Sequence, residues 1–198
     1  MSGEPLLCLT SLDVLAEPFP YFTSAEGLNE GLSSAILEWF ETGASWELVE
    51  TDFYEQHEFS LWGVQTPPTL EFLTSRRFLA SLRSKVESIF GAQLGNRIDC
   101  TFHKLVSGQR IRIHNDFIRG AETHRVLVQL NRGWHDDQGG FLMFFNSADP
   151  SDVHRVFSPI HNSVVGFAIS EASHHAVSTI HGGERFTLVF SFYGRDGG

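Results

Sequence analysis

The sequence predicts an α+β protein, mainly β, in which N-terminal helices pack on one sheet of a double-sheet jelly roll. Apolar residues recur at helical spacing in the first half of the 198-residue chain. From Ile98 onward they alternate with a period of two. Phenylalanine is abundant, with a run of such residues from Phe141 to Phe192, and aromatic side chains on strands favour a core between two sheets.

Residues 1–97 are expected to be mostly helical. The first apolar pattern can end at Gly43, and its members are Leu28, Leu32, Ile36, Leu37 and Phe40. A second pattern follows Pro67-Pro68 and runs from Leu70 to Phe90, with Ser75 as a candidate N-cap. Between the two helical patterns, from Trp46 to Trp62, we expect a strand and a loop.

Residues 98–195 are expected to form eight short strands separated by Gly, Asn, Asp and Pro. The expected strands are 98–106, 109–114, 123–130, 140–145, 153–157, 163–169, 174–180 and 184–193. Short strands that follow helices are typical of a jelly roll with helices on one face. The chain length suits one domain, which we expect to span residues 1–198.

Composition argues against several function classes. The net charge of −10 argues against non-specific nucleic-acid binding, and solubility explains it more simply than a cationic substrate does. No apolar run approaches the length of a membrane span, and no basic region precedes the apolar residues near the N-terminus. We therefore expect no membrane segment and no secretory signal. Cys8 and Cys100 fit a reduced cytoplasm, although one disulfide between them stays open.

Three residues form the pattern of a metal site. His114 and Asp116 are two apart on one short extended segment, so both side chains can point inward at one metal, and His175 follows 59 residues after Asp116. Two His and one carboxylate hold non-haem Fe(II) and leave positions open for a co-substrate and O₂. His174 is the adjacent alternative ligand.

Arg185 lies ten residues after His175 on the last expected strand. The face of that strand with Phe186, Phe190 and alternate apolar residues is core, whereas Arg185 and Thr187 lie on the other face. A buried cation without a partner is costly, and the guanidinium fork fits a carboxylate, to which Thr187 adds a hydrogen bond. The pattern predicts an oxygenase with a dicarboxylate co-substrate.

Three stretches of the chain resemble the Fe(II)/2-oxoglutarate-dependent oxygenases, close to the prolyl-4-hydroxylase-like branch. They are residues 104–116 (KLVSGQRIRIHND), 125–142 (RVLVQLNRGWHDDQGGFL) and 175–191 (HAVSTIHGGERFTLVFS). In that branch a Gly precedes the metal-binding His, as Gly108 does, and an Arg opens the next strand, as Arg125 does. The resemblance covers residues 98–195 and implies a double-stranded β-helix fold.

The resemblance also implies roles for individual residues. His114, Asp116 and His175 resemble the catalytic iron ligands, and His175 is favoured over its neighbour because the family shows His-x-Val there. Arg185 resembles the residue that grips the distal carboxylate of 2-oxoglutarate, and Thr187 its frequent hydroxyl partner. The implied cofactors are Fe(II), 2-oxoglutarate as co-substrate, and O₂, with decarboxylation to succinate and CO₂.

Other positions are less defined. The branch often has a Tyr where this chain has Leu105, so a hydroxyl contact to the co-substrate must come from elsewhere, with Gln129 and Asn131 as candidates. Arg110 and Arg112 share the His114 face if their strand is regular, and a substrate contact fits them about as well as a bulge. The remaining histidines are expected to be structural or exposed, and they are His103, His124, His135, His154, His161 and His181.

The substrate is read only from family resemblance. Residues 57–116 and 122–125 resemble, less closely, small bacterial oxygenases that tailor ribosomally made peptides or amino acids. We therefore predict a cytoplasmic dioxygenase that hydroxylates an unactivated C–H of an amino-acid residue in a peptide, or of a free amino acid. A natural-product oxygenase of the same mechanism and a catalytically silent cupin-like binding module stay open. A zinc hydrolase would leave Arg185 and Thr187 unexplained.

Overall fold

The computed structural model describes residues 7–195, so residues 1–6 of the N-terminal stretch considered above lie outside it. The chain is mainly β with helices in its first half, which confirms the predicted fold class. The strands of the first half are β1 (Leu7–Thr10), β2 (Asp13–Leu15), β3 (Tyr21–Ser24), β4 (Glu26–Leu28), β5 (Glu47–Glu50) and β6 (Glu55–Ser60). The strands of the second half are β7 (Leu94–Val106), β8 (Ile111–His114), β9 (Glu122–Gln129), β10 (Leu142–Phe145), β11 (Val153–Phe157), β12 (Val164–Ala168), β13 (His175–Val177) and β14 (Glu184–Gly194).

Two α-helices follow the predicted apolar patterns. Helix α1 (Glu30–Thr42) ends at a glycine, and the 3-10 helix η2 (Pro68–Thr74) precedes helix α2 (Arg76–Phe90). The side chain of Ser75 accepts a hydrogen bond from the third amide of α2, as an N-cap does. Gly91 ends α2 with a φ of 62°, a left-handed conformation that glycine adopts without steric cost.

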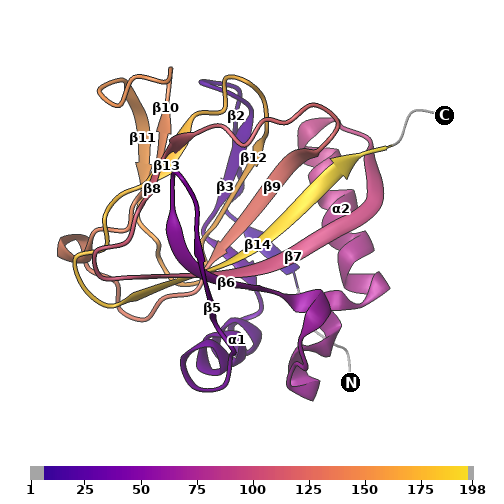
Figure 1. Ribbon diagram of the computed structural model, residues 1–198. Helices are drawn as coiled ribbons and strands as arrows, with labels where there is room; N and C mark the ends of the chain where they lie inside the picture. The colour runs from indigo at the N-terminus through magenta and orange to yellow at the C-terminus, as the bar shows by residue number, and fades with distance from the viewer. Residues whose placement is uncertain (1–6, 196–198) are drawn as a thin grey trace.

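Two large sheets carry the fold (Figure 1). One has four strands in the order β11-β10-β13-β8, and the other has eight in the order β2-β3-β12-β9-β14-β7-β6-β5. All strand pairs within both sheets are antiparallel. The eight predicted strands therefore form the four-stranded sheet and the centre of the larger one. In Figure 1 the four-stranded sheet lies to the left of the large sheet and α2 to the right.

The expectation of a mostly helical first half is wrong, because this half also forms the strands β1 to β6. Strands β2 and β3 extend one edge of the large sheet beside β12, and β6 and β5 extend the other edge beside β7. These strands have only three to six residues. Segments this short carry little periodicity, and β3 and β6 pair with β12 and β7, which lie far away in the sequence. Where a strand and a loop were expected between Trp46 and Trp62, the chain forms two strands, the β5–β6 hairpin.

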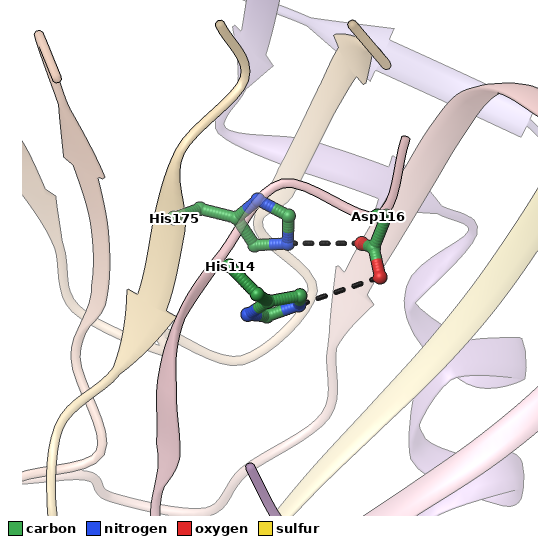
Figure 2. A group of neighbouring side chains, drawn as sticks. All are labelled: His114, Asp116 and His175. Carbon is green, nitrogen blue, oxygen red and sulfur yellow. Dashed lines mark ion pairs between the residues drawn. The ribbon is translucent and has the colours of Figure 1, made fainter. Parts of the chain in front are cut away.

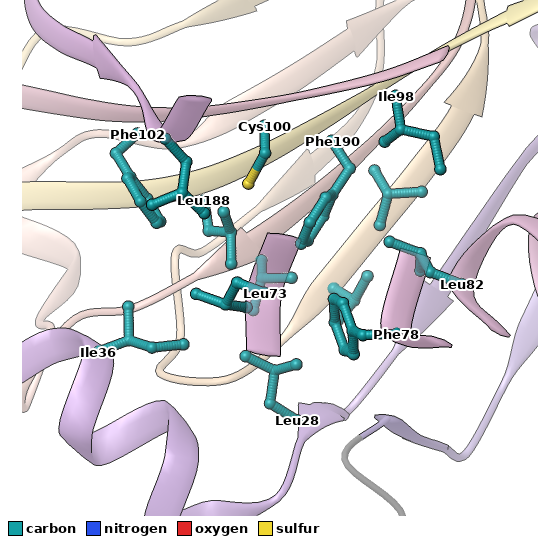
Figure 3. Packing of buried hydrophobic residues seen from close by; sticks show 14 of the residues in the cluster. Leu28, Ile36, Leu73, Phe78, Leu82, Ile98, Cys100, Phe102, Leu188 and Phe190 are labelled. Atoms are coloured by element: carbon teal, nitrogen blue, oxygen red, sulfur yellow. The ribbon is translucent and has the colours of Figure 1, made fainter. Parts of the chain in front are cut away.

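The large sheet separates two apolar clusters. The outer cluster packs Ile36 of α1 and Phe78 and Leu82 of α2 against Phe102 and Phe190 of the sheet (Figure 3). The inner cluster lies between the two sheets, and its members include Phe144, Leu142, Phe167 and Leu127. The helices thus cover one face of the large sheet, and the face toward the smaller sheet is left to form a cavity.

Candidate metal centre

His114, Asp116 and His175 converge at one point between the sheets (Figure 2). β8 and β13 pair so that His114 and His175 lie directly opposite each other, with ring centroids 4.2 Å apart. The Asp116 carboxylate lies 3.4 Å from His114 Nε2 and 3.1 Å from His175 Nε2. One ligand atom from each residue lies within 4.8 Å of the other two. The structure therefore brings together all three predicted ligands.

Backbone carbonyls orient both imidazole rings. His114 Nδ1 lies 2.8 Å from the Arg112 carbonyl, and His175 Nδ1 lies 2.8 Å from the Ser173 carbonyl. A carbonyl only accepts, so each Nδ1 carries a hydrogen and each Nε2 of a neutral ring has a lone pair. Burial lowers the pKa of His175, which favours that neutral form. Two lone pairs and a carboxylate facing one another repel unless a cation lies between them, which fits Fe(II).

Asp116 reaches the cluster by a turn rather than by strand alternation. β8 ends at His114, and Asp116 has a φ of 57°, in the left-handed region. Asn115 holds this turn, because its side chain accepts from the Phe117 amide and donates to the Glu171 carbonyl. The side chains of His114 and Asp116 meet as expected. The expected cause, alternation along one extended segment, is wrong, because the turn at Asp116 brings them together.

Arg125 binds the Asp116 carboxylate through Oδ2, the oxygen that also faces His175. Its NH1 donates to Asp116 Oδ2 at 2.5 Å, while its Nε and NH2 bind Glu122 at 2.9 and 2.7 Å. Burial opposes ionisation of Asp116, but its contacts with the two histidine rings and the charge of Arg125 outweigh it and lower its pKa. The carboxylate is thus ionised and fixed in orientation, as a metal ligand must be.

Arg185 is buried without a carboxylate partner among the described residues. It is 3% exposed, its Nε donates to the Gly140 carbonyl at 2.8 Å, and its NH1 donates to Thr187 Oγ1 at 2.8 Å. The Thr187 hydroxyl in turn donates to Gln129 at 3.1 Å. Burial lowers the pKa of Arg185 to about 10, so the side chain stays charged at neutral pH. A buried, charged fork of this kind needs an anion.

Gly139 and Gly140 allow the chain to pass close to Arg185. Both have positive φ, and a Cβ on Gly140 would lie 3.0 Å from Arg185 Cδ and 2.7 Å from Ile180 Cδ1. The Gly140 carbonyl could not then keep its place beside the guanidinium. The glycine pair is therefore required by the approach of backbone to Arg185 as well as by the turn.

One cavity of about 290 Å³ joins the metal cluster to Arg185. Apolar side chains line it between the two, namely Ile111, Leu127, Leu142, Val177 and Val189. Polar residues outside the metal cluster and the Arg185 pair also line the wall, among them Gln56, Glu58, Thr101, His103 and Ser191. The cavity thus combines apolar walls with many polar groups at fixed places, which can orient a small polar ligand.

The other sequence-based candidates fall in different places. Leu105 is buried in the inner apolar cluster and offers no polar atom. Gln129 supports Thr187, but Asn131 binds the backbone of Pro159 and Phe186 instead. His174 is not part of the metal cluster.

Arg110 and Arg112 line a separate pocket, and Arg112 NH1 donates to the Asp52 carbonyl. His103 was expected to be structural or exposed, yet its side chain lines the cavity.

The residues that sequence reasoning missed come from the β5–β6 hairpin. Phe53 lies over the His114 ring with centroids 4.9 Å apart, and Tyr54 and Glu58 line the cavity wall. Their pattern, Phe-Tyr in a loop followed by alternating polar residues, gave no chemical signal. The pairing of β6 with β7 brings Glu58 to the site, and contacts of Phe53 and Tyr54 with β8 bring the hairpin loop there.

No helix among the described residues has the length and apolar character needed to cross a membrane. A sequence profile of the 2OG-Fe(II) oxygenase superfamily matches residues 100–192. Those residues include the metal cluster and Arg185. A sequence search among curated proteins finds no match.

Solved structures resemble the fold over most of the chain. A prolyl-4-hydroxylase from Pseudomonas putida has a TM-score of 0.73 and 21% identity, over 88% of this chain and 92% of that one. A prolyl hydroxylase from Trichoplax adhaerens, solved with a hypoxia inducible factor peptide fragment, has a TM-score of 0.68 and 15% identity, over 87% and 83%. A viral collagen prolyl hydroxylase from Paramecium Bursaria Chlorella virus-1, solved with 2OG, has 0.63 and 12%, over 88% and 96%. At these identities the likeness shows a shared fold.

Proposed function

Because this chain belongs to the 2OG-Fe(II) oxygenase superfamily, we propose that it hydroxylates an unactivated C–H of an amino-acid residue, in a peptide or as the free amino acid. Its cofactors are Fe(II), 2-oxoglutarate and O₂, as the superfamily implies. We assign the iron to His114, Asp116 and His175. We assign the distal carboxylate of 2-oxoglutarate to Arg185 and Thr187.

One observation carries these assignments: an acceptor cluster that needs a cation and a buried guanidinium that needs an anion line the same cavity. A dicarboxylate whose keto-acid end binds a metal supplies both partners at once. A zinc hydrolase would use the first feature and leave the buried charge of Arg185 without a function. A binding module without activity would need neither feature.

The residues of the chain bind the co-substrate, orient the iron ligands and exclude water. The Arg185 fork and the Thr187 hydroxyl hold the co-substrate at the buried end of the cavity, and Leu127 and Val189 flank its path to the iron ligands. Arg125 keeps the Asp116 carboxylate turned toward the histidines. When bound, Fe(II) couples the oxidative decarboxylation of 2-oxoglutarate by O₂, to succinate and CO₂, to insertion of the second oxygen atom into a substrate C–H bond.

The similar solved structures support an amino-acid substrate. The similar Trichoplax structure holds a peptide fragment, and the other two similar structures are also prolyl hydroxylases. The cavity of about 290 Å³ has room beside the co-substrate for a reacting side chain. We further propose that residues 1–198 fold as one domain, since β3, β5 and β6 join the sheet that carries Arg185.

The test is anaerobic titration of Fe(II) and 2-oxoglutarate into the metal-free protein, read by the weak visible charge-transfer band of iron-chelated 2-oxoglutarate. We expect a band in the wild-type protein, none in Asp116→Ala, and one in Arg185→Ala only at much higher 2-oxoglutarate. Substrate-dependent succinate formation with peptide and amino-acid libraries then tests the substrate class. Oxidation only of metabolites without an amino-acid unit would refute that class, and absence of Fe(II) binding would refute the enzyme assignment.

A further inference from the structure

We propose that Gln56, Glu58 and His103, here called the Glu58 subsite, bind a cationic group of the substrate, either an ammonium or a guanidinium. The three side chains line the same cavity as the metal cluster. The inference rests on the proposed function, because it names the substrate class that this cavity accepts.

Glu58 is a carboxylate on the cavity wall without a cation. Among the described residues its side chain has two polar neighbours, the Gln56 amide at 2.6 Å and His103 Nε2 at 3.9 Å. Burial, and then the charges of Arg125 and Arg185, lower the pKa of His103 to about 3, so this ring is neutral at physiological pH. A half-buried carboxylate with only neutral neighbours is a poorly compensated charge.

The two guanidinium groups of the cavity do not supply the missing charge. Arg125 is already bound to two carboxylates, those of Asp116 and Glu122. Arg185 binds Gly140 and Thr187, and the co-substrate carboxylate would neutralise it. Among the described residues Glu58 therefore has no cationic partner when the co-substrate is in place.

The side-chain oxygen of Gln56 independently indicates that a hydrogen-bond donor from a ligand belongs in the subsite. This residue is 2% exposed, and its Oε1 has no hydrogen-bond partner although it is buried. The amide cannot be turned over to solve this, because Oε1 would then face the Glu58 carboxylate. The Glu58 subsite thus has an unpaired acceptor beside an unpaired negative charge. An ammonium or guanidinium, which has several donors and a positive charge, satisfies both.

Strand register places the Glu58 subsite within reach of the reacting centre. Glu58 lies opposite His103, and His103 lies opposite Thr187, so Glu58 is two strands, or about 10 Å, from the residue that supports Arg185. Tyr54 lines the same cavity, and its pKa is raised by burial and then by the charges of Glu58 and Asp116. A cation at Glu58 would therefore belong to the same molecule whose C–H faces the metal cluster.

The approach to the subsite is acidic as well. Glu47 on β5 lies directly opposite Glu58 on β6, and like charges in that position destabilise a strand pair. A bound cation relieves this repulsion. The cationic group of the substrate can be one of two kinds. It is either the α-ammonium of a free or N-terminal amino acid or the side chain of a Lys or Arg residue.

The experiment measures binding of three matched probes by isothermal titration calorimetry, on metal-free protein and on protein loaded anaerobically with Fe(II) and 2-oxoglutarate. Nα-acetyl-norleucine methylamide has no cation, Nα-acetyl-lysine methylamide has only the side-chain ammonium, and norleucine amide has only the α-ammonium. We expect at least one cationic probe to bind about tenfold tighter than the neutral one. The probe that gains affinity identifies the source of the cation.

The matched variants are Glu58→Gln, Glu47→Gln and Glu50→Gln, which make the same charge change at three places. Glu58→Gln should abolish the preference, Glu47→Gln should reduce it about twofold as an exposed charge would, and Glu50→Gln on the exposed side of β5 should leave it unchanged. Thermal unfolding and the 2-oxoglutarate band check that each variant is folded and loaded.

Equal affinity for all three probes, no binding of either cationic probe, or a preference that survives Glu58→Gln would overturn the inference. Failure of the proposed function looks different, because the visible band would be missing. The calorimetric preference on metal-free protein would then still decide whether Glu58 binds a cation.

Discussion

The two faces of the large sheet use the same strands for opposite purposes. On β14, Phe190 and its neighbours at every second position pack under the helices, whereas Arg185 and Thr187 face the cavity. The outer face is apolar, and its residues are almost completely buried. The inner face carries a row of polar groups from Gln129 through Thr187 and His103 to Glu58.

Stability and ligand binding depend on different faces of the large sheet. Burial of the outer face supplies the hydrophobic stabilisation, and it requires no particular polar partner. The inner row has unmet charge and hydrogen-bonding capacity at Arg185, Gln56 and Glu58, which costs stability until ligands bind. Substitutions on the two faces should therefore have separable effects.

The largest effect is expected from Phe190→Ala on the outer face. Phe190 is 1% exposed and packs against Phe78 of α2 with ring centroids 6.0 Å apart. Loss of this ring leaves a cavity in the outer cluster and should lower the free energy of unfolding by about 3–5 kcal/mol. Chemical denaturation measures it, and one cooperative transition is expected. A large change in the affinity of the folded variant for 2-oxoglutarate would contradict the separation of the two faces.

Arg125→Lys tests orientation at the metal cluster while the charge is kept. Lysine cannot reproduce the fork that holds Glu122 and Asp116 together. We expect the Fe(II) affinity to fall about 10- to 100-fold, as when other groups that orient metal ligands are lost. Competitive metal titration measures this. Arg132→Lys, whose partner Glu41 lies far from the cavity surface, is the control and should bind Fe(II) as the wild type does. An unchanged affinity in Arg125→Lys would show that Asp116 needs no such support.

Thr187→Val should have a smaller effect, confined to the inner face. Valine keeps the shape of threonine but removes the hydroxyl that accepts from Arg185 and donates to Gln129. One buried hydrogen bond to a charged group is lost, so the affinity for 2-oxoglutarate should fall about tenfold. The anaerobic band measures this dissociation constant. If the affinity does not change, Thr187 is a structural partner only.

The sequence predicted β14 and the metal cluster because their signals are local or repeated. The alternation of Phe186 to Phe192 identifies a two-faced strand, and His114, Asp116, His175 and Arg185 have residue types that few structural roles require. The Glu58 subsite could not be predicted in this way. Glu58 is an ordinary residue in a short hairpin, and its importance arises from pairing with β7, a contact across 45 positions that no local pattern encodes.

The turn at Asp116 shows the same limit on a smaller scale. Strand alternation would have placed the His114 and Asp116 side chains on one face, but the strand ends at His114 and a left-handed residue aims the carboxylate. The interactions that enforce the turn come from Glu171 and Ser173, far away in sequence. The sequence thus predicted which side chains meet and not the backbone that orients them.

The smallest effect that the two-face comparison predicts is a pH dependence of the outer face. His124 packs against Phe90 of α2 with ring centroids 4.9 Å apart, and burial lowers its pKa to about 4. Below its unfolded pKa of about 6.5, the unfolded chain binds a proton that the folded chain refuses, so stability present at pH 7 is lost as the pH falls toward 4. The full pKa shift corresponds to about 2 kcal/mol between pH 7 and pH 5, and because the ring is partly exposed we expect His124 to contribute half of that, about 1 kcal/mol. Denaturation of the wild type and of His124→Phe, which keeps the ring contact without the titration, measures the difference. Parallel pH profiles for the two proteins would show that the acid sensitivity arises elsewhere, with His103 on the inner face as the next residue to test.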